Sequence, residues 1–402
     1  MCSPWDMWQS CPFVDDRTAL RRYCLAVRSL RIAIIGGPQY DQIDASLAAF
    51  TAATGVAVEV AYRDAHMSLN RHVAESLSGG GHYDLVSTHS KYAPSQAHGL
   101  MPLDELVPNE RLSEMHPSAL GLCRVDGTLM CLPRNIDARL LFINRALVDD
   151  AWEPGSWADL RNTLTDLSQR IGVPGYAFPT RDSGLFGTFY ELVAAFGGHL
   201  FDDEGGAHFD SPEAAAALEW LVDASSIDGM TPRSMAADGW YFDEVSAGFR
   251  AGQVAVVADW PGYYGLLAAQ PGLRETTRVL RSPVGIDGRR HVYAGCHAWA
   301  IPSGATDVGL SMSLLLHLSA QETARVDATA GMVPVRLDVA MPADHPLDVA
   351  RAELLRFTVA DDLLTFPPLA HYPEIEDAAS VALRAALVGS CSASDALASI
   401  SI

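Results

Sequence analysis

Basic residues are scarce in this 402-residue sequence, and lysine is almost missing. Lys and Arg together number 28 against 49 Asp and Glu, which gives a formal net charge of −21 at pH 7. Lys91 is the only lysine, an arginine bias typical of a GC-rich genome. Such an acidic chain is poorly suited to bind nucleic acid or an anionic membrane surface, so we expect neither as a partner.

The sequence also lacks segments for membrane insertion or export. No window of about 18 residues is free of charged and polar groups, which argues against a membrane span. Asp15 and Asp16 precede the basic pair Arg21-Arg22, and no apolar stretch of about 7–15 residues follows, so the start does not match a secretory signal. Cys24 lacks the small neighbours of a lipoprotein cleavage site. As written, the chain is expected in the cytoplasm, with residues 1–28 as an N-terminal extension.

Motifs for catalysis and for metal binding are absent as well. The sequence contains no G-x-S-x-G, no H-E-x-x-H, no phosphate-binding P-loop and no Cys-x-x-Cys pair. The 13 His and 7 Cys are scattered without the spacing of metal ligands or of a disulfide framework. We therefore predict no catalytic residue, no cofactor and no metal, and an enzyme is the less favoured hypothesis.

What the sequence does contain is strand-like segments alternating with helix-like ones. Its hydrophobic content of 49% is enough for two cores. Strands that alternate with helices indicate a parallel sheet with helical crossovers, so the fold class is α/β. The first half of this pattern predicts strands at Arg31–Ile35, Val56–Tyr62 and Tyr83–Ser87, with helices at Asp41–Thr54 and Ser68–Leu77. The next part predicts helices at Ser156–Ile171, Gly184–Phe196, Ser211–Ser225 and Phe242–Ala251, a strand at Gln253–Asp259, and a helix at Val308–Leu318.

The most informative segment is Gly127–Leu147, GTLMCLPRNIDARLLFINRAL. A turn at Asp126-Gly127 leads into two apolar runs separated by a polar break, and Asn144 is expected to cap a helix. This segment resembles the first hinge crossing of family 1 extracellular solute-binding proteins, the sugar-capturing subunits of ABC importers. The positions that fit the family pattern are Gly127, Met130, Leu132, Pro133, Asp137, Arg139, Leu141, Phe142 and Asn144.

Four later segments resemble the same family in the expected order. They are Phe249–Gly262, Val292–Pro302, Gly331–Arg336 and Tyr372–Val388. The resemblance implies a two-lobed periplasmic-binding-protein-like fold of type II, with discontinuous lobes joined by a hinge and a ligand cleft between them. The expected lobe 1 comprises residues 29–136 and 262–302, and the expected lobe 2 comprises 137–261 and 303–402. The chain would cross near Arg134–Ala138, near Trp260 and after Pro302.

Candidate ligand-binding residues lie where predicted strands end, because ligands of open α/β sheets bind there. Tyr40 could stack on a sugar ring, and carboxylate or amide oxygens such as those of Asp137 could accept from hydroxyls. The candidates at these loops are Gln39, Tyr40, Thr88, His89, Lys91, Asn135 and Asp137. Trp240, Trp260 and Tyr263 could provide an aromatic platform, although core packing is the alternative for each.

Three further candidates lie in segments where the resemblance implies contact with ligand. Gly295 would let a group approach the backbone closely. Cys296 replaces a family glycine and is expected to shrink the site. Arg336 would clamp hydroxyls or a carboxylate, or else pair with an acid of this acidic chain.

The resemblance implies binding of a carbohydrate by hinge closure, without a chemical step. The expected partners are the small-molecule sugar and ABC permease subunits, and the chain is expected to be a monomer. The resemblance implies an extracellular or membrane-associated location, in contrast to the missing export signal. A cytosolic sugar-sensing protein of the same fold, or an enzyme built on it, remains an alternative.

Overall fold

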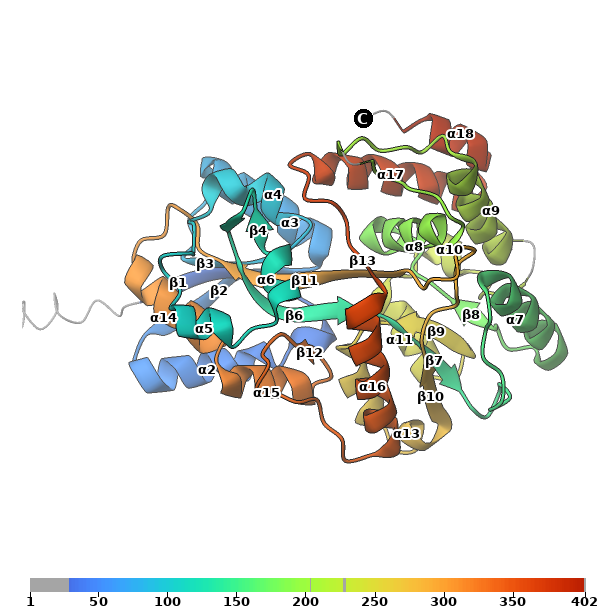
Figure 1. The fold of residues 1–402 in the computed structure, drawn as a ribbon, viewed down its shortest axis with the longest axis horizontal. Coiled ribbons are helices and arrows are strands. Elements are labelled where there is room, and N and C mark those ends of the chain that lie inside the picture. The colour runs from blue at the N-terminus through green and yellow to red at the C-terminus, as the bar shows by residue number, and fades with distance from the viewer. Residues whose placement is uncertain (1–28, 203, 227–228, 401–402) are drawn as a thin grey trace, which may run out of the picture.

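The computed structural model describes residues 29–202, 204–226 and 229–400, so the predicted extension at 1–28 lies outside the described residues. Two lobes are visible, each built on its own sheet (Figure 1). The larger sheet has seven strands in the order β12-β6-β11-β3-β1-β2, with β13 beside β11, and the smaller has four in the order β10-β7-β9-β8. Among the described residues, no helix has the length and apolarity needed to cross a bilayer.

The first lobe begins with the predicted strand–helix alternation. Its parallel strands are β1 (Ser29–Ile35), β2 (Ala57–Asp64) and β3 (Leu85–His89). Apolar spacing along α2 (Ile43–Thr54) buries Leu47 and Phe50, and the helix ends at Gly55, whose positive φ of 71° is the left-handed cap a glycine adopts. The shorter elements that follow are η2 (Pro38–Tyr40), α3 (His66–Glu75), η3 (Ser76–Gly80), α4 (Ala93–Gln96), η4 (Ala97–Gly99), α5 (Asn109–Ser113), α6 (Pro117–Leu122), β4 (Arg124–Val125) and β5 (Thr128–Leu129).

The second lobe surrounds an almost wholly buried helix, α8 (Asp182–Ala195). Its strands are β7 (Leu140–Asn144), β8 (Tyr176–Ala177), β9 (Val256–Asp259) and β10 (Thr277–Leu280). The predicted start of α7 (Trp157–Ile171) is confirmed, because the hydroxyl of Ser156 accepts the Asp159 amide at 3.1 Å. The other helices are α9 (Pro212–Ser226), α10 (Met235–Asp238), α11 (Phe242–Arg250), α12 (Tyr263–Ala268), α13 (Leu273–Thr276), α16 (Pro346–Asp361), α17 (Tyr372–Leu387) and α18 (Ala393–Ala398).

Two long strands carry the chain between the lobes. β6 (Leu132–Ala138) and β11 (Val292–Ala300) pair antiparallel in the larger sheet, with Gly295 opposite Asp137 (Figure 1). β7 follows β6 after the single residue Arg139 and joins the smaller sheet, so the first crossing lies at Arg139. Asn144 does not cap a helix: its side-chain oxygen accepts the Ala146 amide at 2.9 Å, and turns follow.

The pairings differ from the expected lobe boundaries at two places. β10 pairs with β7, so the chain does not return to the first lobe near Trp260 but stays with the smaller sheet until β11. After β11, α14 (Val308–Leu318) packs its apolar face on the first core, α15 (Gln321–Thr329) follows it, and β12 (Val333–Pro334) pairs with β6. Residues 308–334 therefore lie with the first lobe, where we expected the second. β13 (Leu363–Leu364), between α16 and α17, pairs with the start of β11.

Candidate functional site

A small cavity of about 30 Å³ lies where the two lobes meet. Six of the residues that line it were predicted from the sequence: Gln39, Tyr40, His89, Lys91, Asp137 and Trp260. The other five are His66, Ser183, Phe242, Tyr293 and His297. The ends of β1 and β3 and the paired strands β6 and β11 provide most of its wall, while α8, α11 and the end of β9 close it from the second lobe. This is the edge of the sheet where open α/β folds bind ligands.

The centre of the cavity wall is His297. Its Nε2 lies 2.7 Å from the Tyr40 hydroxyl and 3.1 Å from Nε2 of His66, and the Asp137 carboxylate is 3.5 Å away. Burial lowers the pKa of His66 and His89 well below the ordinary value, and that of His297 to about 3. The three imidazoles are therefore neutral and able to exchange hydrogen bonds at pH 7.

Asp137 is the carboxyl group of the cavity and is 7% exposed. One oxygen accepts the Asn135 side-chain amide at 2.7 Å, while Oδ2 has no hydrogen-bond partner. Burial raises the pKa of Asp137 to about 8, although the nearby Arg134 opposes the rise. Arg134 cannot neutralise it further, because its guanidinium holds Asp327 through two bonds of 2.8 and 2.9 Å.

Aromatic rings from the second lobe and from β11 face this polar wall. Trp260 meets Phe242 edge-on at 5.6 Å between ring centroids and Tyr293 at 5.4 Å. The guanidinium of Arg139 lies 5.3 Å from the Trp260 ring and pairs with Glu191. The indole N–H of Trp260 has no partner within the structure, so it is available to a ligand.

Lys91 lines the cavity, but its ammonium is committed. It donates to Glu376 of α17 at 2.7 Å and to the Tyr293 hydroxyl at 3.2 Å. Desolvation by burial opposes its charge, yet the Glu376 carboxylate prevails and raises the pKa of Lys91. Lys91 is thus a contact between the lobes as well as a wall of the cavity.

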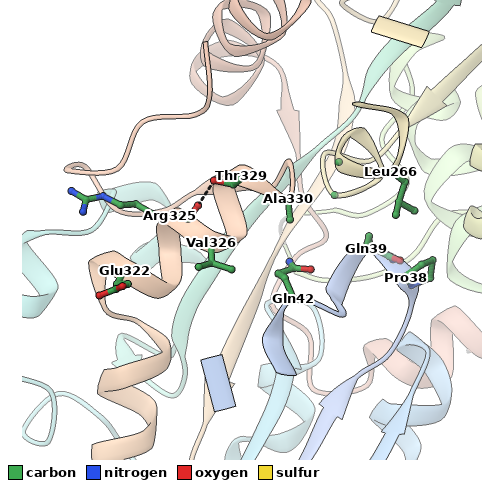
Figure 2. A pocket seen from close by; sticks show the side chains of 11 residues that line it. Pro38, Gln39, Gln42, Leu266, Glu322, Arg325, Val326, Thr329 and Ala330 are labelled. Atoms are coloured by element: carbon green, nitrogen blue, oxygen red, sulfur yellow. Dashed lines mark hydrogen bonds between the residues drawn. The ribbon is translucent and has the colours of Figure 1, made fainter. Parts of the chain in front are cut away.

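A larger groove of about 660 Å³ lies beside the cavity, and Gln39 lines both. Figure 2 shows Val326 of α15 and Ala330, which follows the helix, on one side of this groove and Gln39 and Gln42 opposite. Leu266 of α12 contributes the second lobe's wall, so the groove is also bounded by both lobes. The cavity accommodates one small group, whereas the groove has room for a sugar-sized molecule.

Residues 45–353 match the model of the bacterial extracellular solute-binding protein family. The chain belongs to this family. The resemblance and the fold class predicted from the sequence are thereby confirmed. A comparison with curated protein sequences gives no match.

Solved solute-binding proteins share the fold at low sequence identity. Maltose-bound MalE3 of T. maritima aligns with a TM-score of 0.84 and 23% identity, over 92% of this chain and 97% of that one. A Thermotoga lettingae protein bound with α-D-tagatose gives 0.79 and 21%, over 93% and 98%. The GacH receptor of Streptomyces glaucescens, solved unliganded and with acarbose, gives 0.77 and 19%, over 93% and 96%.

Four predicted residues of this solute-binding protein lie beside the cavity rather than in its lining. Gly295 packs against His89, because a β-carbon there would come within 2.1 Å of the ring, and Asn135 sits behind Asp137 as its hydrogen-bond donor. Thr88 donates to Gln96 at 2.7 Å, and Tyr263 donates to Asp243. These residues shape the wall without facing the space inside.

Three other predictions do not match the positions found. Cys296 alternates with Gly295 and His297 along β11 and points into the first core, so it does not shrink the site. Trp240 packs over Gly248 away from the cavity. Arg336 pairs with Asp338 at 2.8 Å and with Glu114 at 2.9 Å, the acidic-partner alternative.

The sequence contained a signal for three of the missed residues. Tyr293, Gly295 and His297 share one face of a strand because side chains alternate with period two, so a glycine expected to face ligand implicates its i±2 neighbours. His66 follows β2 as Tyr40 follows β1, at the same edge of the sheet. No comparable signal marks Ser183 or Phe242, which reach the cavity only because the second lobe folds over it.

Proposed function

We propose that this solute-binding protein captures a carbohydrate between its lobes. The observation that carries the proposal is the arrangement of the cavity: the unpaired oxygen of Asp137 and the imidazoles lie on one side, and the rings of Trp260, Phe242 and Tyr293 border the other. Sugars present hydroxyls at their edges and C–H groups on their faces, which suits such a site. The ligands named for the structural relatives, maltose, α-D-tagatose and acarbose, support the same class.

Binding requires movement of the lobes in this proposal. A cavity of about 30 Å³ is comparable with the volume of one water molecule and too small for a sugar ring. The lobes would separate to admit the sugar and close again by rotation about the strands between them. The adjoining groove would take parts of the ligand that the cavity cannot hold.

The proposed role is that of the substrate-binding component of an ABC sugar importer, acting as a monomer that delivers its ligand to permease subunits. No chemical step is part of it.

Thermal unfolding against a panel of mono- and oligosaccharides tests the proposal. A ligand at 100 times its Kd adds about 2.7 kcal/mol to the free energy of unfolding, since it binds the folded state alone. For lobes of this size the midpoint would rise by several degrees, at about 2–4 °C per kcal/mol. A shift with one sugar class supports the proposal, and the absence of a shift with every sugar would refute the carbohydrate assignment.

A further inference from the structure

The cavity has hydrogen-bond acceptors without donors. Asp137 and Gln39 both line the cavity, and Oδ2 of the first and Oε1 of the second have no hydrogen-bond partner among the described residues. The orientation of Asp137 is fixed, because the Asn135 amide can only donate to its other oxygen. Buried acceptors left without donors are costly, so the missing donors are expected to come from the ligand.

No cationic side chain pairs directly with the carboxyl of Asp137, whose pKa of about 8 keeps it protonated at pH 7 until a bound cation displaces the proton. Besides Asp137, the imidazoles and the phenols, the lining contains one further ionisable side chain, that of Lys91. Its ammonium is paired with Glu376 at 2.7 Å. The guanidinium of Arg134, whose charge acts on Asp137, is committed to Asp327, and that of Arg139, which follows β6, to Glu191. A ligand that carries positive charge would complete the balance at this position.

Aromatic rings surround the same space. Tyr40, Tyr293, Trp260 and Phe242 line it together with three neutral imidazoles. Cations are attracted to the faces of such rings, most strongly to tryptophan, once water is excluded. A volume of about 30 Å³ fits an ammonium group, and the sugar body to which it is attached would extend toward the groove that shares Gln39.

We infer that the natural ligand is an amine-bearing sugar whose protonated amino group binds Asp137. This inference rests on the proposed carbohydrate binding and specifies its substrate class. An ammonium group offers donors and no acceptor, as the free oxygens of the cavity require, whereas a hydroxyl both donates and accepts.

A metal ion is the competing occupant. Ligand atoms of His89, Asp137 and His297 lie within 4.8 Å of one another. One fact favours the amine. The Lys91 amide donates to Nδ1 of His89 at 3.2 Å, so the proton of the neutral ring sits on Nε2 and leaves it no lone pair for a metal.

The test compares sugars that differ only by an amino group in place of a hydroxyl. Isothermal titration at about pH 7.5, where an amine is still largely protonated and Asp137 begins to ionise, would give Kd values for glucosamine and glucose, galactosamine and galactose, and chitosan disaccharide and cellobiose. In at least one pair we expect the amino sugar to bind about tenfold to a hundredfold more tightly, as charged hydrogen bonds do. N-acetylglucosamine, whose nitrogen carries no charge, should lose this advantage.

Asp137→Asn is the matched variant, because it keeps the shape and removes the charge. The preference for the amino sugar should disappear, while in Asp259→Asn, which alters a buried carboxyl outside the cavity, the preference should remain. Equal or weaker binding of the amino sugars by the wild type would overturn the inference and leave carbohydrate binding intact. If neither the amino sugar nor its hydroxyl counterpart bound in any pair, both this inference and the proposed carbohydrate binding would be overturned. Zn²⁺ binding to chelator-treated protein that His89→Ala abolishes would assign the cluster to a metal instead.

Discussion

Lys91 and Glu376 form an ion pair across the two lobes, with Nζ and Oε1 2.7 Å apart and the side chains only 3% and 2% exposed. Lys91 follows β3 of the first lobe, and Glu376 lies on α17 of the second. Glu376 also accepts from Tyr92 at 2.5 Å and from Tyr372 at 2.9 Å, so its oxygens are saturated. The single lysine of the chain therefore holds the lobes together at the edge of the binding cavity.

Glu376→Gln is expected to destabilise the closed arrangement of the lobes. The substitution leaves the Lys91 ammonium buried without a counter-ion, which typically costs about 3–5 kcal/mol. Urea unfolding would measure the change in the free energy of unfolding. The double variant Lys91→Met/Glu376→Leu should recover part of the loss, because it removes both charges.

The neighbouring residue provides the control for this prediction. Asp377, next on α17, pairs with Arg71 across the same lobes at 2.8 Å, but both side chains are about half exposed. Asp377→Asn should change stability by less than about 1 kcal/mol, since exposed pairs contribute little. Equal effects of the two substitutions would show that burial does not determine the strength of the Lys91 pair.

Trp260→Ala is expected to raise the Kd of the sugar that shifts the unfolding midpoint. The increase should be at least tenfold, which corresponds to about 1.4 kcal/mol of binding free energy. The indole lines the cavity, and its N–H has no hydrogen-bond partner among the described residues. Trp240→Ala is the matched control, because that ring packs over Gly248 outside the lining. Isothermal titration would distinguish them, and similar losses in both variants would mean that Trp260 acts through stability alone.

Helices and strands were predicted well where a single local sequence signal determines where they begin and end. The apolar spacing of α2 and its glycine cap, the capping serine of α7, and the run of α14 all gave the observed helices within two residues or so at each end. In contrast, β10 is a four-residue strand that exists only because β7 offers it an edge. Tertiary pairing of that kind leaves no period in the sequence, so the predicted return at Trp260 was misplaced.

Residues of the candidate site could be predicted from the sequence where their position along a strand decides whether the side chain faces the cleft. Tyr40, His89 and Asp137 follow from strand ends and the hinge, since parallel strands end at one edge of a sheet. Cys296 was misjudged because we treated a whole segment as facing ligand, although alternation sends its side chain into the core. Arg336 could not be assigned, because the position of Asp338 and Glu114 around it depends on the fold of the loop.

Gly295→Ala is expected to disturb the cavity by displacing the His89 ring that lines it. A β-carbon at this position would lie 2.1 Å from Cε1 of His89, so the ring must move. Overpacking of this kind typically costs about 1–3 kcal/mol, and ligand affinity should fall with it. Gly304→Ala, where no atom lies within 4 Å of the added carbon, should affect neither. Normal binding by Gly295→Ala at reduced stability would show that His89 is not required in its present position.

Asp259 makes a contribution to the free energy of unfolding that decreases as the pH rises. Burial raises the pKa of this carboxyl to about 7 from 3.8, despite its bond from the Trp260 amide and the charges of Arg250 and Arg139. The folded state therefore favours the protonated form. Its contribution to the free energy of unfolding is fully present below about pH 3.8 and is lost as the pH rises to 7, at about 1.4 kcal/mol per pH unit.

Asp259→Asn removes this ionisation and keeps an oxygen for the Trp260 amide. The variant should gain on the wild type by up to about 3 kcal/mol between pH 5 and pH 8, because only the wild type must then ionise a buried group. Urea unfolding at several pH values would give both curves. Other groups with raised pKa, such as Asp137, affect both proteins alike, so the difference between the curves isolates Asp259. Parallel curves would mean that the carboxyl is solvated well enough to ionise freely, and that the end of β9 opens to water beside Trp260.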